Sequence, residues 1–388
     1  MTFNADFSGN IRQGGLSSGI SLSDKVDTLA GVKGVYYIDD GGFGGYRFSQ
    51  DDSSIVWSKS DPPFRSTMYP DMEDGVLYFS HGGSDSALYG LNFESGNTKV
   101  SYTLSDYIQE SAAVKDGIAY LGFRDSNFNQ FIRAYDIDND TVKWTDGINS
   151  EADLEKAVVD GSLYFGDSTG MFYSYDIDTG NRNWETSLDN DPRGPIVIGG
   201  TVYVTNGDDN LASIDPSDGS INWKSNTYDE VLPPIYVDKK LITGTEDSDV
   251  YVAININDGS EAWTYSVTEP LTVPAVYDGY AYCANENGDV FKLDISDGTE
   301  DWRVSASGSP QFGDTNQSPN FVAIQNDLMY IGGGGNQPSV YVFDISDGSE
   351  VRNIDASNSN DFSEGGVLID KSQFSYHKAP GRFSDPGE

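Results

Sequence analysis

The chain has 388 residues, too many for one ordinary hydrophobic core, so the length favours several domains or one repeat architecture. Its 23 Lys and Arg stand against 62 Asp and Glu, and the formal net charge of −39 opposes binding to nucleic-acid phosphates or an anionic membrane surface. The acids are spread along the whole sequence, and strong salt screening would remove their mutual repulsion. We therefore exclude nucleic acid as a direct partner and expect a high-salt environment, with an ordinary acidic surface protein as the alternative.

Residues 1–30 are rich in Gly, Ser and Asp, as is the tail at residues 379–388, and this composition is typically disordered in isolation. The start lacks a basic segment followed by an apolar one, and no run of 18 apolar residues occurs, so we predict neither an export signal nor membrane insertion. The predicted organisation is an N-terminal arm over residues 1–30, one domain over residues 31–378, and a C-terminal tail over residues 379–388.

A short acidic motif that usually ends in tryptophan recurs eight times, and its last positions lie 39 to 50 residues apart. In chain order the copies are FSQDDSSIVW (48–57), NFESGNTKV (92–100), YDIDNDTVKW (135–144), YDIDTGNRNW (175–184), SIDPSDGSINW (213–223), AININDGSEAW (253–263), KLDISDGTEDW (292–302) and FDISDGSEVR (343–352).

A second piece precedes the motif in several units, as in KDGIAYLG (115–122), VDGSLYFG (159–166) and YDGYAYCA (277–284). Together the two pieces predict short alternating strands bounded by Asp-Gly turns, at a period near 40 residues, which is typical of a four-stranded propeller blade. We predict an all-β, eight-bladed β-propeller, with seven blades as the alternative. The segment EGGVLIDKSQFSYH (364–377) is expected to complete blade one and close the ring.

The most acidic copy of the motif can be compared with a calcium-binding loop. Asp136, Asp138 and Asp140 match the first three ligand positions of an EF-hand loop, but Thr141 stands where that loop needs glycine and Gly147 where it needs glutamate. The alternative is a turn in which acidic side chains cap backbone N–H groups, and we favour it. We predict no metal site.

The motif resembles that of the quinoprotein-type (PQQ-like) repeat family, whose propeller blades carry Ala-x-Asp-x-x-Thr/Asp-Gly-x-x-x-Trp, and the resemblance covers about residues 32 to 378. Members of this family include quinone-dependent alcohol dehydrogenases, a propeller lipoprotein that helps to assemble bacterial outer-membrane barrels, and non-enzymatic scaffolds. The resemblance implies that the motif tryptophan docks between adjacent blades. That role accounts for all six tryptophans of the chain: Trp57, Trp144, Trp184, Trp223, Trp263 and Trp302.

The resemblance implies quinone catalysis, but the chain lacks residues that this chemistry needs. The dehydrogenases stack their cofactor near a disulfide between adjacent cysteines, whereas this chain has one cysteine, Cys283. His81 and His377 are the only histidines, and the glycine runs at residues 41–45 and 332–335 lack the Lys-Ser/Thr and the following helix of a phosphate cradle. We predict a non-enzyme without a cofactor.

Departures from the repeat are the expected binding sites. The loops of units eight, one, two and three are longer or richer in glycine than those of units four to seven, and the largest insertion spans residues 305–320. These loops carry four candidate aromatic anchors: Phe43, Phe128, Phe131 and Phe312. A second candidate is a set of axial carboxylates that precede the innermost strands: Glu110, Glu155, Glu230, Glu269 and Glu364.

The functional prediction is a non-catalytic structural and binding module that acts with protein partners in an assembly, or on a cell-surface protein or glycan. A virion structural or host-attachment protein of a virus that infects haloarchaea is put first, because virion proteins need no secretion signal. A cell-envelope assembly scaffold similar to the outer-membrane propeller lipoprotein is the first alternative. A small quinone-dependent dehydrogenase is the second.

Overall fold

A computed structural model gives the fold, and it describes residues 34–39, 44–48, 55–59, 71–73, 75–81, 86–103, 107–108, 112–188, 192–206, 210–225, 228, 231–232, 234–245, 248–269, 272–312, 320–325, 327–333, 339–355 and 364–369. This part of the chain forms 35 strands and no helix. It also contains no helix of the length and apolar character needed to cross a membrane.

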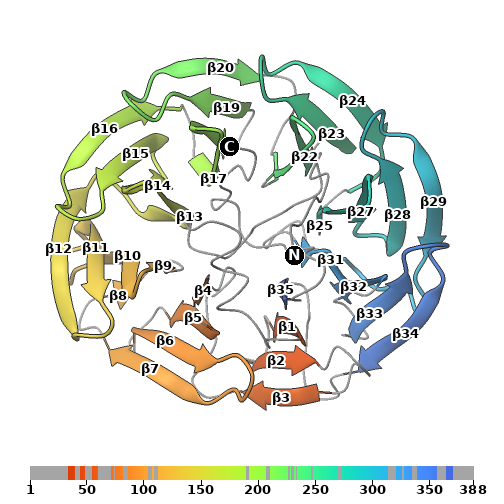
Figure 1. The fold of residues 1–388 in the computed structure, drawn as a ribbon, viewed down its shortest axis with the longest axis horizontal. Coiled ribbons are helices and arrows are strands. Elements are labelled where there is room, and N and C mark those ends of the chain that lie inside the picture. Colours follow the sequence, from red (N-terminus) through yellow and green to blue (C-terminus); the bar gives the residue numbers. More distant parts are fainter. Residues whose placement is uncertain are drawn as a thin grey trace, which may run out of the picture.

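Eight antiparallel sheets of four or five strands are arranged around a ring, one for each repeat unit (Figure 1). Blade one consists of β1 (Gly34–Asp39), β2 (Gly44–Phe48), β3 (Ile55–Lys59) and β35 (Glu364–Ile369). Blade two consists of β4 (Asp71–Glu73), β5 (Val76–His81), β6 (Ala87–Asn92) and β7 (Thr98–Thr103). Blade three consists of β8 (Tyr107–Ile108), β9 (Ala113–Lys115), β10 (Ile118–Arg124), β11 (Gln130–Asp136) and β12 (Thr141–Ile148). Blade four consists of β13 (Ala152–Val159), β14 (Ser162–Asp167), β15 (Met171–Asp176) and β16 (Arg182–Ser187).

The other half of the ring repeats this plan. Blade five consists of β17 (Pro192–Ile198), β18 (Thr201–Asn206), β19 (Asn210–Ile214) and β20 (Ile221–Ser225). Blade six consists of β21 (Ile235–Val237), β22 (Lys240–Gly244), β23 (Val250–Asn255) and β24 (Glu261–Ser266). Blade seven consists of β26 (Ala275–Tyr277), β27 (Tyr280–Ala284), β28 (Asp289–Asp294) and β29 (Glu300–Ser305). Blade eight consists of β31 (Ala323–Gln325), β32 (Leu328–Gly333), β33 (Ser339–Asp344) and β34 (Glu350–Asp355). A short parallel pair, β25 (Thr272–Val273) with β30 (Asn320–Phe321), links the segments that enter blades seven and eight.

The ring closes as the sequence predicts. The C-terminal strand β35 pairs antiparallel with β1, and Tyr36 faces Val367 across the pair. The first blade is thus built from both ends of the repeat region, which removes the free edges that an open sheet would present. A prediction that fails is simple alternation along every strand. In β14 and β18 five successive residues are buried, because neighbouring blades cover both faces, whereas an outer strand such as β24 alternates.

Each motif tryptophan spans the boundary to the following blade. The indole N–H of Trp263 in β24 donates to the carbonyl of Ile295 in the next turn, at 2.9 Å, and only 5% of the Trp263 residue is exposed. This arrangement buries a large ring while its one polar atom remains satisfied. The other five tryptophans make the same donation, Trp57 to Phe93, Trp144 to Ile177, Trp184 to Pro216, Trp223 to Ile256 and Trp302 to Ile345.

The motif glycine receives the tryptophan of the preceding blade. Gly298 has a φ of 75°, and a Cβ atom there would lie 2.7 Å from Cε3 of Trp263. The glycine is therefore required twice, for its left-handed backbone and for the space above it. The same close approach occurs at Gly96, Gly180, Gly219, Gly259 and Gly348.

Unit three shows why its motif departs from the others. The preceding unit has Val100 in place of tryptophan, so the turn of unit three receives no motif tryptophan. The glycine slot there is filled by Asp140, which has a φ of 55° and whose carboxylate accepts a hydrogen bond from the hydroxyl of Tyr135. Between these two blades Tyr102 stacks on Tyr135, with ring centroids 3.7 Å apart. The motif has glycine where the tryptophan ring of the preceding blade needs the space, and another residue where the preceding blade has no motif tryptophan.

Candidate functional site

The acidic side chains of the motif turns cap backbone groups. In unit seven, Asp294 accepts a hydrogen bond from the N–H of Ser296 at 2.7 Å, and Asp297 accepts one from the N–H of Thr299 at 3.0 Å. The bonds from the backbone and hydroxyl of Thr299 lower the pKa of Asp297 below its ordinary value of 3.8. In the part of the chain that the structure describes, no group of three or more His, Cys, Asp or Glu side chains is placed to hold a metal ion.

The EF-hand-like turn of unit three follows the same rule. Asp136 accepts hydrogen bonds from the backbone N–H and the side-chain amide of Asn139, both at 2.9 Å. These two bonds lower the pKa of the Asp136 carboxyl. Its acidity thus serves local turn geometry, as the capping alternative predicts.

The motif turns join the third and fourth strands of each blade. The loops between the second and third strands lie at the other end of the blades. In blade three this loop comprises residues 125–129, between β10 and β11, and is called the blade-three loop below. Asp125 organises it by accepting hydrogen bonds from the N–H groups of Asn127 (2.8 Å) and Asn129 (2.9 Å) and from the Asn129 side chain (2.9 Å). The side-chain bond from Asn129 is the main reason that the pKa of Asp125 is lowered.

The blade-three loop displays Phe128. This side chain is 71% exposed, and its backbone has a φ of 66°, a region that bulky residues rarely adopt. The Arg124 guanidinium lies 5.2 Å from the centroid of its ring. Of the predicted anchors with described side chains, Phe128 alone is exposed. It lies at the end of blade three from which the chain continues to blade four, because Gln130, just after the loop, pairs with Ile148, the last residue of β12.

The other predicted anchors lie elsewhere. Phe131 in β11 is half-buried and stacks on Phe123 of the neighbouring strand at 5.2 Å. Phe312 is fully buried, with its ring edge against Tyr341, so its interpretation as a partner anchor is wrong. The insertion folds this ring into the core between blades seven and eight, where burial outweighs exposure to a partner. Phe43 lies outside the described residues.

The axial carboxylates are only partly described. Glu269 lies in the connection from blade six to blade seven, and its carboxylate accepts a hydrogen bond from the Asn287 side chain at 3.2 Å. Glu155 and Glu364 lie in β13 and β35, but their side chains are not among the described ones, and Glu110 and Glu230 lie outside the described residues. An acidic ring therefore stays a prediction.

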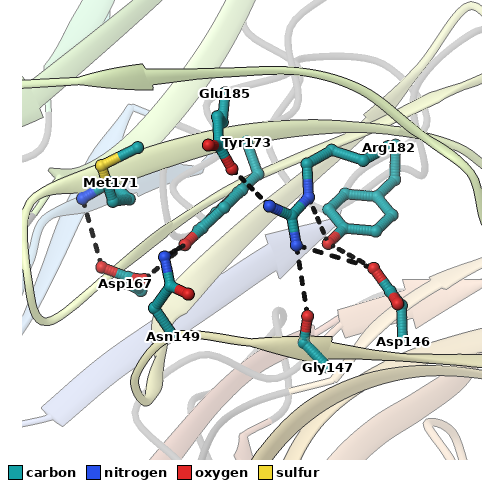
Figure 2. Close-up of polar contacts among 9 residues, drawn as sticks. Asp146, Gly147, Asn149, Asp167, Met171, Tyr173, Arg182 and Glu185 are labelled. Carbon is teal, nitrogen blue, oxygen red and sulfur yellow. Dashed lines mark hydrogen bonds and ion pairs between the residues drawn. The ribbon is translucent and has the colours of Figure 1, made fainter.

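A polar cluster that the sequence reasoning missed lies between blades three and four (Figure 2). Arg182 in β16 donates from Nε to the hydroxyl of Tyr175 (2.9 Å) and from its terminal nitrogen to the carbonyl of Gly147 (3.2 Å). The Tyr175 hydroxyl donates in turn to Asp146 at 2.9 Å, and Arg182 also forms an ion pair with Glu185. The guanidinium therefore joins the outer strands of two blades.

The same cluster contains a fully buried carboxylate. Asp167 at the end of β14 accepts hydrogen bonds from the N–H groups of Thr169 (2.9 Å) and Met171 (3.1 Å) and from the hydroxyl of Tyr173 (2.7 Å). The Asn149 side chain donates to that hydroxyl at 3.2 Å. Burial, and then the bond to Asp167, raise the pKa of Tyr173 above its ordinary value of 10.0. Both carboxylate oxygens are used internally, which fits an inter-blade clamp that stiffens the scaffold beside the blade-three loop.

The chain is similar in sequence to a known protein family. The model of a family described as outer membrane protein assembly factor BamB matches residues 21–225, 129–270 and 228–368. The chain belongs to this family. The match confirms the predicted PQQ-like propeller repeats and covers both the blade-three loop and the inter-blade clamp.

Curated relatives carry the same name. BamB of Yersinia pestis is 23% identical over 236 residues, which cover 56% of this chain and 58% of the relative. BamB of Nitrosomonas eutropha is 27% identical over 154 residues, which cover 38% of this chain and 37% of the relative. The matches thus span less than two thirds of these relatives. Both relatives are named as outer membrane protein assembly factors, and neither name mentions a catalytic activity.

Solved structures support the propeller fold. BamB from Moraxella catarrhalis aligns with a TM-score of 0.58 at 13% identity over 72% of this chain and 88% of that one. The dihydro-heme d1 dehydrogenase NirN aligns at 0.67 with 10% identity over 87% of this chain and 75% of that one. The quinohemoprotein alcohol dehydrogenase from Comamonas testosteroni aligns at 0.55 with 11% identity over 79% of this chain and 70% of that one. At these identities the likeness concerns the fold alone.

Proposed function

We propose that this protein is a non-catalytic scaffold that binds protein partners in a cell-envelope assembly. The observation that carries the proposal is membership of a family whose model and curated relatives are named outer membrane protein assembly factors. This is the first alternative of the sequence analysis, and the comparisons favour it over the virion protein that was put first.

The described site is consistent with binding rather than with catalysis. The acidic turns are used to cap backbone groups, and the buried Asp167 is used to hold Tyr173. Phe128, by contrast, is 71% exposed, so most of its surface is not used in blade packing. A rigid ring that presents an aromatic side chain on a short loop fits a partner-binding scaffold, because binding energy concentrates in buried aromatic anchors.

Fractionation of the native source tests this proposal directly. Mass spectrometry of cytoplasmic, envelope and particle fractions, after chemical cross-linking, is expected to recover the chain in the envelope fraction with cross-links to membrane-assembly proteins. Recovery in the cytoplasmic fraction would contradict the proposal. Recovery in purified virus particles would replace it with the virion role, which stays a prediction.

The high-salt setting is a separate part of the proposal and rests on the net charge of −39. At a salt concentration near 1 M the Debye length falls to about 3 Å, so repulsion between exposed carboxylates is largely screened. The melting temperature should therefore rise as potassium chloride increases from 0.1 to 2 M. A melting temperature that is constant or falls over this range would contradict a high-salt adaptation.

A further inference from the structure

We propose that the blade-three loop is a preformed anchor that inserts Phe128 into an apolar socket on a partner protein, and that Lys and Arg side chains rim this socket. The inference rests on the proposed scaffold function and names the part of the surface and the chemistry of the partner. It follows from a comparison of three loops of the same construction and from the charge of the chain.

The loops after β10, β14 and β27 are built alike. Each begins with Asp or Asn whose side chain accepts a hydrogen bond from the N–H four residues later, at 2.9 Å for Asp125, 3.1 Å for Asp167 and 2.8 Å for Asn285. The carbonyl of the same residue accepts a bond from the N–H three residues later, at 3.0, 3.0 and 3.1 Å. This pattern forces the fourth loop residue into the left-handed region.

The fourth residue is glycine in two loops and phenylalanine in the third. Gly170 and Gly288 have φ values of 87° and 84°, and Phe128 has 66°. Both glycines are buried, and their carbonyls accept bonds from the following connection, Gly170 from Leu188 and Gly288 from Ala306, each at 2.8 Å. Glycine is the residue that this backbone favours, so phenylalanine works against the stability of the loop.

The strained phenylalanine gains little burial in return. Its 71% exposure compares with 38% to 47% for the other large hydrophobic side chains that the described residues expose. Those four, Val56, Val142, Ile221 and Val351, are aliphatic and lie on the outer strands β3, β12, β20 and β34. Of the five exposed side chains, Phe128 is the one aromatic. The Arg124 guanidinium lies 5.2 Å from the ring centroid, and the 71% exposure leaves much of the residue free for a partner.

Charge decides among possible occupants of this surface. With a formal charge of −39, contact with nucleic acid, anionic lipid or a second copy of the chain brings like charges together, whereas contact with a basic surface pairs opposite charges at short distances, where salt screens them least. Within the loop, Asp125 uses its carboxylate for internal hydrogen bonds, so the aromatic ring is the contact that the loop offers. A socket that is apolar at its centre and basic at its rim complements both features.

The test uses the full chain and three variants of an immobilised peptide. Each peptide carries a central Leu-Phe-Leu cluster flanked by three Lys, three Ser or three Glu on each side. The wild-type protein is expected to bind the Lys-flanked peptide at least about tenfold more tightly than the Glu-flanked one, since opposite charges lower the dissociation constant. Equal binding of the Lys- and Glu-flanked peptides would overturn the charge assignment.

Two substitutions separate anchoring from folding. Phe128→Gly restores the residue of the sister loops, so we expect it to raise the melting temperature and to weaken binding of the Lys-flanked peptide at least about tenfold. Val142→Thr, at an exposed site of β12 in the same blade, should leave both measurements unchanged. Undiminished binding by Phe128→Gly, or a lower melting temperature, would overturn the inference.

Other partners of the Phe128 surface, a second copy of the chain or anionic lipid, would give distinct experimental results. Sedimentation that shows a wild-type dimer lost in Phe128→Gly, or binding to phosphatidylglycerol vesicles lost in that variant, would overturn the basic protein partner. The proposed scaffold function is judged separately by fractionation. An envelope location with cross-links that survive Phe128→Gly would defeat this inference alone, whereas a cytoplasmic location with Phe128-dependent peptide binding would defeat the scaffold function alone.

Discussion

The two ends of the blades differ in how strictly they repeat. At the motif end, six tryptophans donate to the following turn and six glycines receive them, with only small variations in geometry. At the loop end, the same five-residue loop holds Gly170 in blade four and Phe128 in blade three. Because closing the ring needs every blade boundary, the motif end is nearly uniform, with tryptophan in six of the eight units. The loop end contributes less to closure and can vary with function.

The blade boundaries themselves differ in polarity. Between blades six and seven the core consists of side chains such as Val276, Phe291 and Leu293, around Trp263. Between blades three and four the equivalent face of β15 carries Tyr173 and Tyr175, which bind Asp167 and Asp146. One boundary is held by apolar packing and the other adds a satisfied polar network. Substitutions at the two boundaries separate these contributions.

The largest effect is expected at the apolar boundary. Trp263→Ala should lower the free energy of unfolding by about 3 to 5 kcal/mol, because it opens a cavity and removes the bond to Ile295. Denaturant unfolding followed by tyrosine fluorescence and circular dichroism measures the change. Trp302→Ala is the matched control, since Trp302 is half-buried and its bond to Ile345 is longer, at 3.2 Å. A larger loss in the control would contradict the role of burial.

The glycine beneath that tryptophan gives the next effect. Gly298→Ala should cost about 2 to 4 kcal/mol, because it adds overpacking against Trp263 to the strain of a φ of 75°. Gly279→Ala shares the backbone strain at a φ of 80°, but no atom lies within 4 Å of its added Cβ, so about 1 kcal/mol is expected. Equal losses for the two variants would show that the ring contact is unimportant.

The polar boundary is expected to respond more weakly. Tyr173→Phe should cost about 1 to 3 kcal/mol, because it removes a donor to the buried Asp167 and an acceptor of Asn149. Thermal and denaturant unfolding measure it. Tyr203→Phe is the control, since the hydroxyl of Tyr203 reaches the Ile256 carbonyl only at 3.4 Å. Similar losses in the two variants would mean that the network adds nothing beyond ordinary tyrosine burial.

The smallest effect is a pH dependence on the alkaline side. Burial, and then the bond to Glu300, raise the pKa of Tyr265 from 10.0 to about 12. A raised folded pKa means that the folded state holds the proton more tightly, so stability is full below pH 10 and is lost as pH rises toward 12. The melting temperature should fall over this window, and Tyr265→Phe should make the fall shallower. An unchanged slope in the variant would contradict the assignment.

Much of the fold could be predicted from the repeat. The period of the motif predicts the strands and their grouping, and EGGVLIDKSQFSYH predicts a closing strand, which the pairing of β35 with β1 confirms. The inner strands were expected to alternate, but their residues are buried on both faces. Alternation along one strand depends on what covers each face, and a single blade does not contain that information.

The site was less predictable. Phe312 and Phe128 both stand in departures from the repeat, yet one is buried and the other is exposed. A signal was available for the clamp, because unit four has Tyr173 and Tyr175 where unit six has Val252 and Ile254. The partners of those tyrosines come from the preceding blade, so only the assembled boundary identifies them.

The sequence by itself determined the number of repeat units, the motif turns and the tryptophans that dock, because local turn chemistry and a fixed period are written within each unit. The sequence also contains a correlation between the last residue of one unit and the glycine position of the next, which only the tertiary structure explains. Glycine follows each unit that ends in tryptophan, whereas Asp140 follows Val100, and Ser53 fills the glycine slot of unit one, which would follow Arg352 around the ring. The tertiary structure decided which loop residues are buried and gave the reason for the pairing, since each glycine lies beneath the ring of the preceding blade.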